Sequence, residues 1–219
     1  MRPSLTICLL LSSSLLFSGC AISKYHKLSC QEENSRMEPV INRAGVQKYK
    51  ASIDVLKNHL TGLLIVKQTD SVTKHLVFVT ELGMKMFDLE AKDNQLKAVY
   101  VFEPLNKPLF IESLVRNFSN MFLLNTEGRI FKDCKNRDKQ PVVTWKQGKD
   151  TWYYTGSGDD DSKKIYPRLQ ETFHKSKRSS KIEYVVGKQG IWYYSQIKCK
   201  QYGLVKFYFE LNAIPPSND

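Results

Sequence analysis

The most regular feature of this chain is an alternation of apolar and polar residues. From Tyr49 to Val55 every second residue is apolar and the residues between are polar, and the same pattern returns from Val205 to Leu211. A period of two residues predicts β-strands with one buried face. Comparable short segments predict eleven strands, at residues 49–55, 60–68, 75–80, 84–90, 96–102, 130–134, 142–147, 151–155, 182–186, 191–199 and 204–211. Because the connections are short, we expect sequential antiparallel pairing.

The period changes between the fifth and sixth predicted strands. Over residues 109–124 apolar side chains recur every three or four positions, and Pro108 can occupy the first helical turn. The segment therefore predicts one amphipathic helix, whose polar residues fill the other face. Its apolar face, which includes Leu114, Phe118 and Met121, is too wide for a surface helix. We expect a mainly β fold (α+β) in which this helix packs on the sheet.

The N-terminus indicates export and lipidation. An apolar stretch at residues 5–17 follows Arg2 and is too short to span a membrane, but its length is typical of a signal peptide. It ends in Ser18-Gly19-Cys20, which resembles the lipobox of bacterial lipoproteins, where the signal is removed and the cysteine is acylated. The alternative is an ordinary secretory signal with a chance cysteine. Several acyl chains on Cys20 would anchor the protein stably in membrane lipid.

These patterns divide the chain into four parts. We expect a signal peptide at 1–19, a lipidated N-terminus and polar tether at 20–45, a β domain at 46–214 and a C-terminal tail at 215–219. Three cysteines, Cys30, Cys134 and Cys199, remain beside the lipidated one in the mature chain. A bridge between Cys134 and Cys199 on neighbouring strands is one reading, and buried unpaired thiols are the favoured one.

The charge points to an anionic partner. The net charge is +11, from 33 Lys+Arg against 22 Asp+Glu, and residues 163–181 hold seven basic residues and one acid. For a membrane-anchored protein the nearest anion is a lipid headgroup, for which each basic residue contributes ~1 kcal/mol. We assign Lys175, Lys177 and Arg178 to contact with an anionic surface, and a solvated loop without a partner is the alternative. Nucleic acid is not expected after export, and no recognition motif is present.

The sequence offers little catalytic chemistry. It contains no nucleophile elbow, phosphate-binding loop or zinc-protease motif, and its four histidines lie far apart. The acidic turn at 158–161 lacks the ligand spacing of a calcium loop. A sugar-binding platform could form from the aromatic residues of two Trp-Tyr-Tyr segments, although aromatic residues on strands more often fill a core: Trp152, Tyr154, Trp192 and Tyr194. We expect no enzyme activity, no cofactor and no metal.

The lipobox, the eleven strands and the helix after the fifth strand together resemble the lipoprotein localisation factors of the LolA and LolB type. The likeness spans residues 49–211. It implies an unclosed antiparallel β half-barrel with a helical lid over a concave face that holds acyl chains. The groove and its lid would be formed by Leu114, Phe118 and Met121. Leu82, between the third and fourth strands, would engage the membrane.

Two functions are consistent with these features. The first is a monomeric lipoprotein of the bacterial envelope, anchored in the outer membrane and facing the periplasm, whose hydrophobic groove binds lipid or acyl chains in lipoprotein handling. The alternative is a structural or interaction lipoprotein of the outer membrane with the same fold, a filled core and no ligand. The two functions differ in whether the concave face binds a ligand or is filled by the protein's own side chains.

Overall fold

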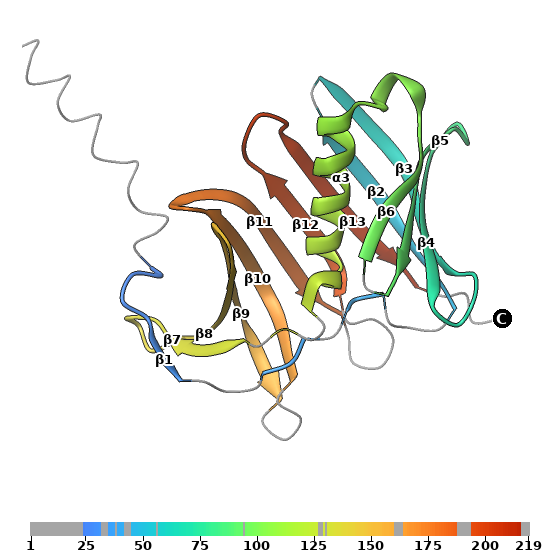
Figure 1. Cartoon of the computed structure of the whole chain (residues 1–219). Helices are drawn as coiled ribbons and strands as arrows, with labels where there is room; N and C mark the ends of the chain where they lie inside the picture. Colours follow the sequence, from blue (N-terminus) through green and yellow to red (C-terminus); the bar gives the residue numbers. More distant parts are fainter. Residues whose placement is uncertain are drawn as a thin grey trace, which may run out of the picture.

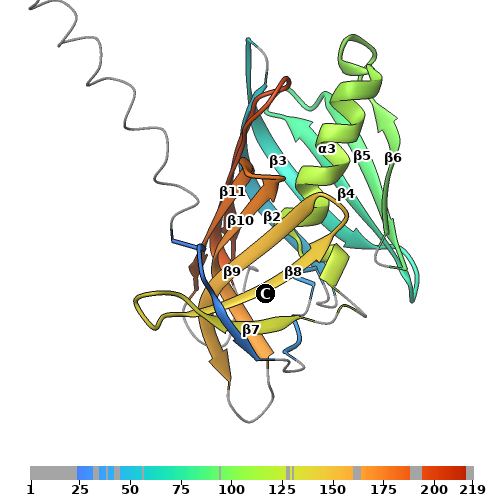
Figure 2. The same ribbon diagram turned by 60° about the vertical axis from the view of Figure 1, so that its left-hand side comes forward.

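The computed structural model describes residues 24–31, 35–37, 39–41, 45–55, 57–93, 95–126, 129, 131–159, 164–187 and 194–215. Within these residues the chain forms one antiparallel sheet of thirteen strands and one α-helix, α3 (Pro108–Met121). The sheet curves into an open trough with α3 on its concave side (Figure 1). The two rims, formed by β7–β9 and by β4–β6, remain apart (Figure 2). The predicted fold class, a mainly β unclosed sheet with a single helix, is confirmed.

The strands follow one another around the sheet with two breaks in chain order, where β1 pairs with β7 and where β13 pairs with β2. They are β1 (Ser29–Gln31), β2 (Val46–Val55), β3 (Asn58–Gln68), β4 (Thr73–Thr80), β5 (Lys85–Lys92), β6 (Gln95–Val101), β7 (Lys132–Lys135), β8 (Pro141–Gln147), β9 (Asp150–Asp159), β10 (Lys164–His174), β11 (Lys177–Val186), β12 (Tyr194–Gln201) and β13 (Phe207–Ile214). β2 to β6 form one meander and β7 to β13 another. They join where β13 pairs with β2, with Phe209 opposite Ile53.

Backbone conformation explains where helix α3 begins and ends. Pro108 occupies its first turn after the extended residue Lys107. The helix ends at Met121, three residues before the predicted end, because Leu123 has a φ of 56° and cannot continue it. A short 3-10 turn, η3 (Leu124–Thr126), follows, and another, η2 (Glu103–Leu105), precedes the helix.

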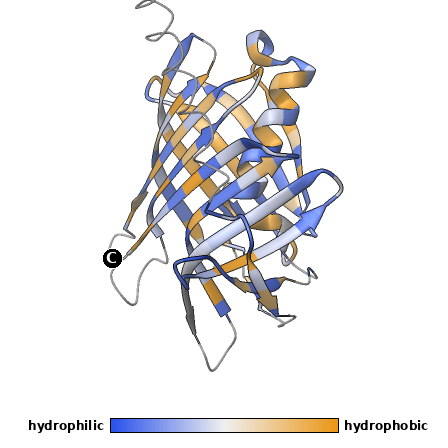
Figure 3. Ribbon diagram, turned by 90° about the vertical axis from the view of Figure 1, so that its left-hand side faces the viewer, coloured by the Kyte–Doolittle hydropathy of each residue, from blue (hydrophilic) through white to orange (hydrophobic). Residues whose placement is uncertain are grey.

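The main hydrophobic core fills the space between α3 and the concave face of the sheet. Phe118 contacts Phe87 of β5 and Phe209 of β13, with ring centroids 5.3 Å apart in both pairs. Hydrophobic positions alternate with hydrophilic ones along the strands (Figure 3), so one face of each strand lines this core. All three rings are almost fully buried. The wide apolar face of the helix therefore covers the apolar face of the strands.

The segment predicted as a tether is attached to the sheet instead. β1 pairs with β7 at the edge of the sheet, and Tyr25 stacks on Tyr153 with ring centroids 4.0 Å apart. Tyr25 belongs to a second, smaller apolar cluster on the convex face. The sequence did not predict this, because β1 has three residues, all of them exposed.

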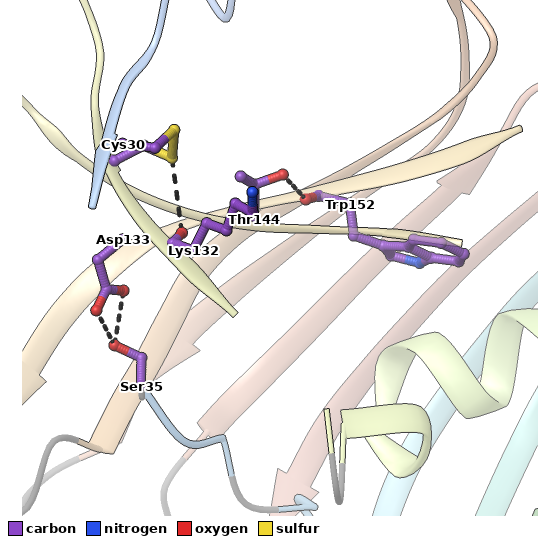
Figure 4. The surroundings of a disulfide bond; sticks show 7 residues. Cys30, Ser35, Lys132, Asp133, Thr144 and Trp152 are labelled. Atoms are coloured by element: carbon purple, nitrogen blue, oxygen red, sulfur yellow. Dashed lines mark hydrogen bonds between the residues drawn. A yellow bond between two sulfur atoms is a disulfide. The ribbon is translucent and has the colours of Figure 1, made fainter. Parts of the chain in front are cut away.

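A disulfide fixes the same segment. Cys30 of β1 is bonded to Cys134 of β7 (Figure 4), and Cys199 is a free, buried thiol. The bridge considered between Cys134 and Cys199 is therefore wrong. The two residues lie on β7 and β12, which are five positions apart in the sheet. The favoured reading of buried unpaired thiols holds for Cys199 alone.

The basic run 163–181 also differs from the predicted loop. Most of it forms the hairpin β10–β11. β10 lacks an apolar alternation because several of its buried residues are polar, and Pro167 lies beside a shift in register. The eleven predicted strands correspond to β2–β9 and β11–β13, so the apolar pattern missed β1 and β10.

Candidate functional site

The three residues predicted to form the groove and lid lie on the concave face. Leu114, Phe118 and Met121 have 0% of their surface exposed. Phe122, one residue beyond α3, packs edge-on against Tyr49 of β2. In this state the helix occupies the apolar surface that an acyl chain would need. A ligand can reach that surface only if α3 moves.

The other side of α3 meets the sheet through hydrogen bonds. Asn117 donates to Gln201 of β12, and Gln201 Nε2 donates to Ser113 Oγ at 3.5 Å. Trp152 Nε1 of β9 donates to Asn120 Oδ1 at 3.2 Å. These residues were not predicted as part of a site, because Ser and Asn on an amphipathic helix normally face solvent. In this protein the curved sheet surrounds the helix and buries them.

The two sides of α3 therefore differ in the kind of contact they make. Toward β2, β5 and β13 aromatic rings pack against one another. Toward β9 and β12 buried hydrogen bonds add to apolar packing, because Trp152 and Cys199 belong to the same core. We call this hydrogen-bonded side the polar side of α3. Each hydrogen bond there contributes only about 0.5–1.5 kcal/mol net, because water replaces the partner when it opens.

Three titratable groups on that polar side are neutral. Burial raises the pKa of the Cys199 thiol and of the Tyr154 and Tyr184 hydroxyls well above their usual values. Tyr184 donates its hydroxyl to the Asn120 carbonyl oxygen at 3.2 Å. The nearby cation is Arg129, which stands over the ring of Trp145.

The aromatic residues considered for sugar binding fill the core. Trp152, Tyr154 and Tyr194 are buried in the main cluster, and Trp152 stacks on Trp145 with ring centroids 4.1 Å apart. Trp192 lies outside the described residues, as do residues 160 and 161 of the acidic turn. The described aromatic side chains present no open platform.

The turns of five hairpins gather at one end of the sheet, which we call the hairpin end. It comprises the β2–β3, β4–β5, β8–β9, β10–β11 and β12–β13 turns, because antiparallel pairing brings them to the same edge. Leu82 in the β4–β5 turn is 92% exposed, and Leu204 in the β12–β13 turn is 96% exposed. Lys175 and Lys177 of the β10–β11 hairpin are exposed at the same end.

Arg178, the third predicted contact with an anionic surface, is already engaged. Its Nη2 lies 2.7 Å from Glu171 Oε1, and the Glu171 side chain is 1% exposed. Tyr25 donates its hydroxyl to Glu171 Oε2 at 2.6 Å, and Lys24 forms a further ion pair with that carboxylate. Burial and the hydrogen bond to Glu171 raise the pKa of Tyr25. Arg178 thus helps to attach the N-terminal segment to the convex face through Glu171, and its contact with an anionic surface stays a prediction.

Cys20 lies outside the described residues, so its lipidation stays a prediction. Among the helices that the described residues form, none has the length and hydropathy needed to cross a membrane.

Comparison with known proteins gives little further guidance. No protein-family model matches the chain, and no curated protein matches it significantly. Among solved structures, it is similar to a DUF1329 family protein from Desulfovibrio piger, with 10% sequence identity over 82% of this chain and 89% of that one and a TM-score of 0.38. Likeness at this level says nothing about what this chain binds. Its function has to be inferred from its own residues.

Proposed function

We propose that this protein is a lipid-anchored protein of the bacterial envelope whose concave face receives an acyl chain when α3 moves aside. The observation that supports this most directly is the placement of one helix over the apolar face of an unclosed sheet. An unclosed sheet has two free rims, so its interior can open without breaking a strand pair.

The energetics of acyl binding are favourable. Each buried CH₂ group of a chain contributes about 0.8 kcal/mol. A long chain therefore replaces the apolar contacts that α3 loses. The hydrogen bonds of the polar side are replaced by water at small net cost.

We further propose that the hairpin end faces the membrane. Leu82 would insert among the lipids, and Lys175 and Lys177 would contact anionic headgroups. Their high exposure supports this role. Anchoring through acylated Cys20 would hold the protein at the outer membrane, on its periplasmic side.

A second candidate function is favoured by one observation. Leu114, Phe118 and Met121 are fully buried, as expected for an interaction lipoprotein with a filled core and no ligand. In this alternative the lipid anchor and the membrane-facing hairpin end are the same. The difference is that the concave face is filled by the protein's own side chains and takes up no ligand.

The experiment that separates the two is acyl binding by the mature chain. A fluorescent fatty acid should bind at micromolar concentration. Phe118→Asp should weaken that binding at least about tenfold, because the displaced helix would still cover the acyl chain with its apolar face, and a carboxylate buried against the chain costs several kcal/mol. Leu109→Asp is the matched control, since Leu109 is on the same helix and 60% exposed. It should leave binding unchanged.

Circular dichroism must show that the strands of Phe118→Asp are intact. If the unmutated chain binds no acyl probe at micromolar concentration, the concave face is filled by its own side chains. The interaction lipoprotein then replaces the acyl-binding protein.

A further inference from the structure

Five side chains on β10 and β11 have buried polar atoms without a hydrogen-bond partner among the described residues, and three of them, Gln170, Thr172 and Ser180, are uncharged. Gln170 is 0% exposed, Ser180 4% and Thr172 5%. Gln170 Nε2, Thr172 Oγ1 and Ser180 Oγ have no hydrogen-bond partner among the described residues. Thr172 and Ser180 are directly opposite each other, and Gln170 is two residues from Thr172 on the same face of β10. Because buried polar groups are normally paired, three unpaired ones together indicate a bound group.

These atoms lie between the sheet and the polar side of α3. Thr172 is also opposite Trp152 on β9, and Ser180 is opposite Gln201 on β12, the residue to which Asn117 of the helix donates. Tyr184 connects the cluster to the helix as well, because its hydroxyl lies 3.2 Å from Gln170 Oε1. The cluster therefore lies on the polar side of α3, where the hydrogen bonds between the helix and the sheet are.

The cluster is chemically neutral. Its members and neighbours are hydroxyl, amide and indole groups, which offer both donors and acceptors. The charged residues Glu171 and Arg178 belong to the opposite face of the hairpin, where they pair with each other and with Tyr25. Arg129 stands over the ring of Trp145, whose other face is covered by Trp152. A carboxylate or phosphate would find no cation among Gln170, Thr172 and Ser180.

We propose that Gln170, Thr172 and Ser180 bind the neutral, hydroxyl- and ester-bearing headgroup of a lipid. Its acyl chain would lie on the apolar half of the concave face, against Phe87 and Phe209. This inference rests on the proposed acyl binding and names the class of lipid. The concave face thus has a small patch of uncharged polar groups beside an apolar surface, which match the two parts of an uncharged glycerolipid.

The test compares two lipids that share one acyl chain, monooleoylglycerol and oleate. The mature chain should bind monooleoylglycerol about tenfold more tightly than oleate, which is the gain expected from two or three hydrogen bonds. The double variant Thr172→Val/Ser180→Ala should lose about that factor for monooleoylglycerol and keep its affinity for oleate. Removing unpaired hydroxyls should leave the melting temperature unchanged or higher, so the variant should fold.

Thr155→Val is the matched control, because alternation along β9 places Thr155 on the convex face together with Tyr153. It should change neither affinity. Equal affinity for the two lipids, or an unchanged affinity of the double variant for monooleoylglycerol, overturns the headgroup site and leaves acyl binding standing. Failure of both lipids to bind overturns acyl binding, and the headgroup site with it.

Discussion

Glu171 is the only acid in the basic run of the sequence, and the structure gives it three partners. Its buried carboxylate accepts a hydrogen bond from Tyr25 and pairs with Arg178 and Lys24. A buried carboxylate needs such partners, because desolvating an unpaired charge is costly. One residue therefore connects the N-terminal segment, β10 and β11.

We expect Glu171→Gln to lower the free energy of unfolding by about 2–3 kcal/mol. Breaking a fully buried pair costs about 3–5 kcal/mol, and the value is smaller here because Arg178 and Lys24 remain partly exposed and can be solvated. Urea unfolding measures the change. Glu183→Gln is the control, since Glu183 pairs with Lys181 in an exposed pair on β11, and it should change the free energy by less than about 0.5 kcal/mol. Equal effects of the two changes would refute the structural role of Glu171.

Single residues also show where sequence reasoning reaches its limit. Leu114 and Phe118 could be placed on the concave side from their spacing, because an apolar residue on a wide helical face has to be buried. Asn117 and Gln201 could not, because a polar residue gives no sign of being buried until its partner is known. The hydrogen bond between them joins a helix to a strand 84 residues further along the chain.

At the scale of elements, β2 and β13 were predicted with little error because each buries one face and alternates strictly. β10 was missed because residues on both of its faces are buried and several of these are polar. An apolar residue pattern reports burial only when buried residues are apolar. β10, which the pattern missed, carries both the buried carboxylate of Glu171 and two residues of the candidate headgroup site, Gln170 and Thr172.

The proposed membrane-facing surface can be tested at the exposed lysines of the β10–β11 hairpin. Lys175→Glu/Lys177→Glu should weaken binding to anionic vesicles at least about tenfold, since each basic residue near the surface contributes ~1 kcal/mol. Sedimentation with the vesicles measures it. The difference should vanish at 1 M salt, where the Debye length is about 3 Å instead of about 10 Å at 0.1 M. Arg178 is left unchanged, because a carboxylate at that position would face Glu171 and destabilise the fold.

The control for this surface is Lys135→Glu/Lys139→Glu. It changes the net charge equally, but at the opposite end of the sheet, where the β7–β8 turn lies. Vesicle binding that depends only on net charge would fall equally in both double variants. That result would favour the alternative, in which the hairpin is a solvated segment without a partner.

At the scale of the whole molecule, the proposed lipid anchor and the proposed membrane-facing hairpin end would act together. The N-terminal segment is fixed to the convex face by Tyr25, by Lys24 and by the disulfide of Cys30. Glu171, which holds it, lies three residues before the end of β10 and so close to the hairpin end. Four peptide units from Cys20 to Lys24 span at most about 14 Å. An acylated Cys20 would therefore hold the hairpin end close to the bilayer.

This arrangement leads to the prediction for the anchor. Cys20→Ala should release the chain from membranes, because the few charged contacts of the hairpin end are screened by salt and acyl chains are not. Membranes are washed at high salt, and the protein is quantified in the pellet and the supernatant. Cys199→Ala is the control, since that thiol is fully buried in the core and does not reach the surface of the protein, and the chain should stay in the pellet. If Cys20→Ala also stays there completely, something other than an acyl chain attaches the protein, and the orientation inferred from the short connection between Cys20 and Lys24 no longer follows.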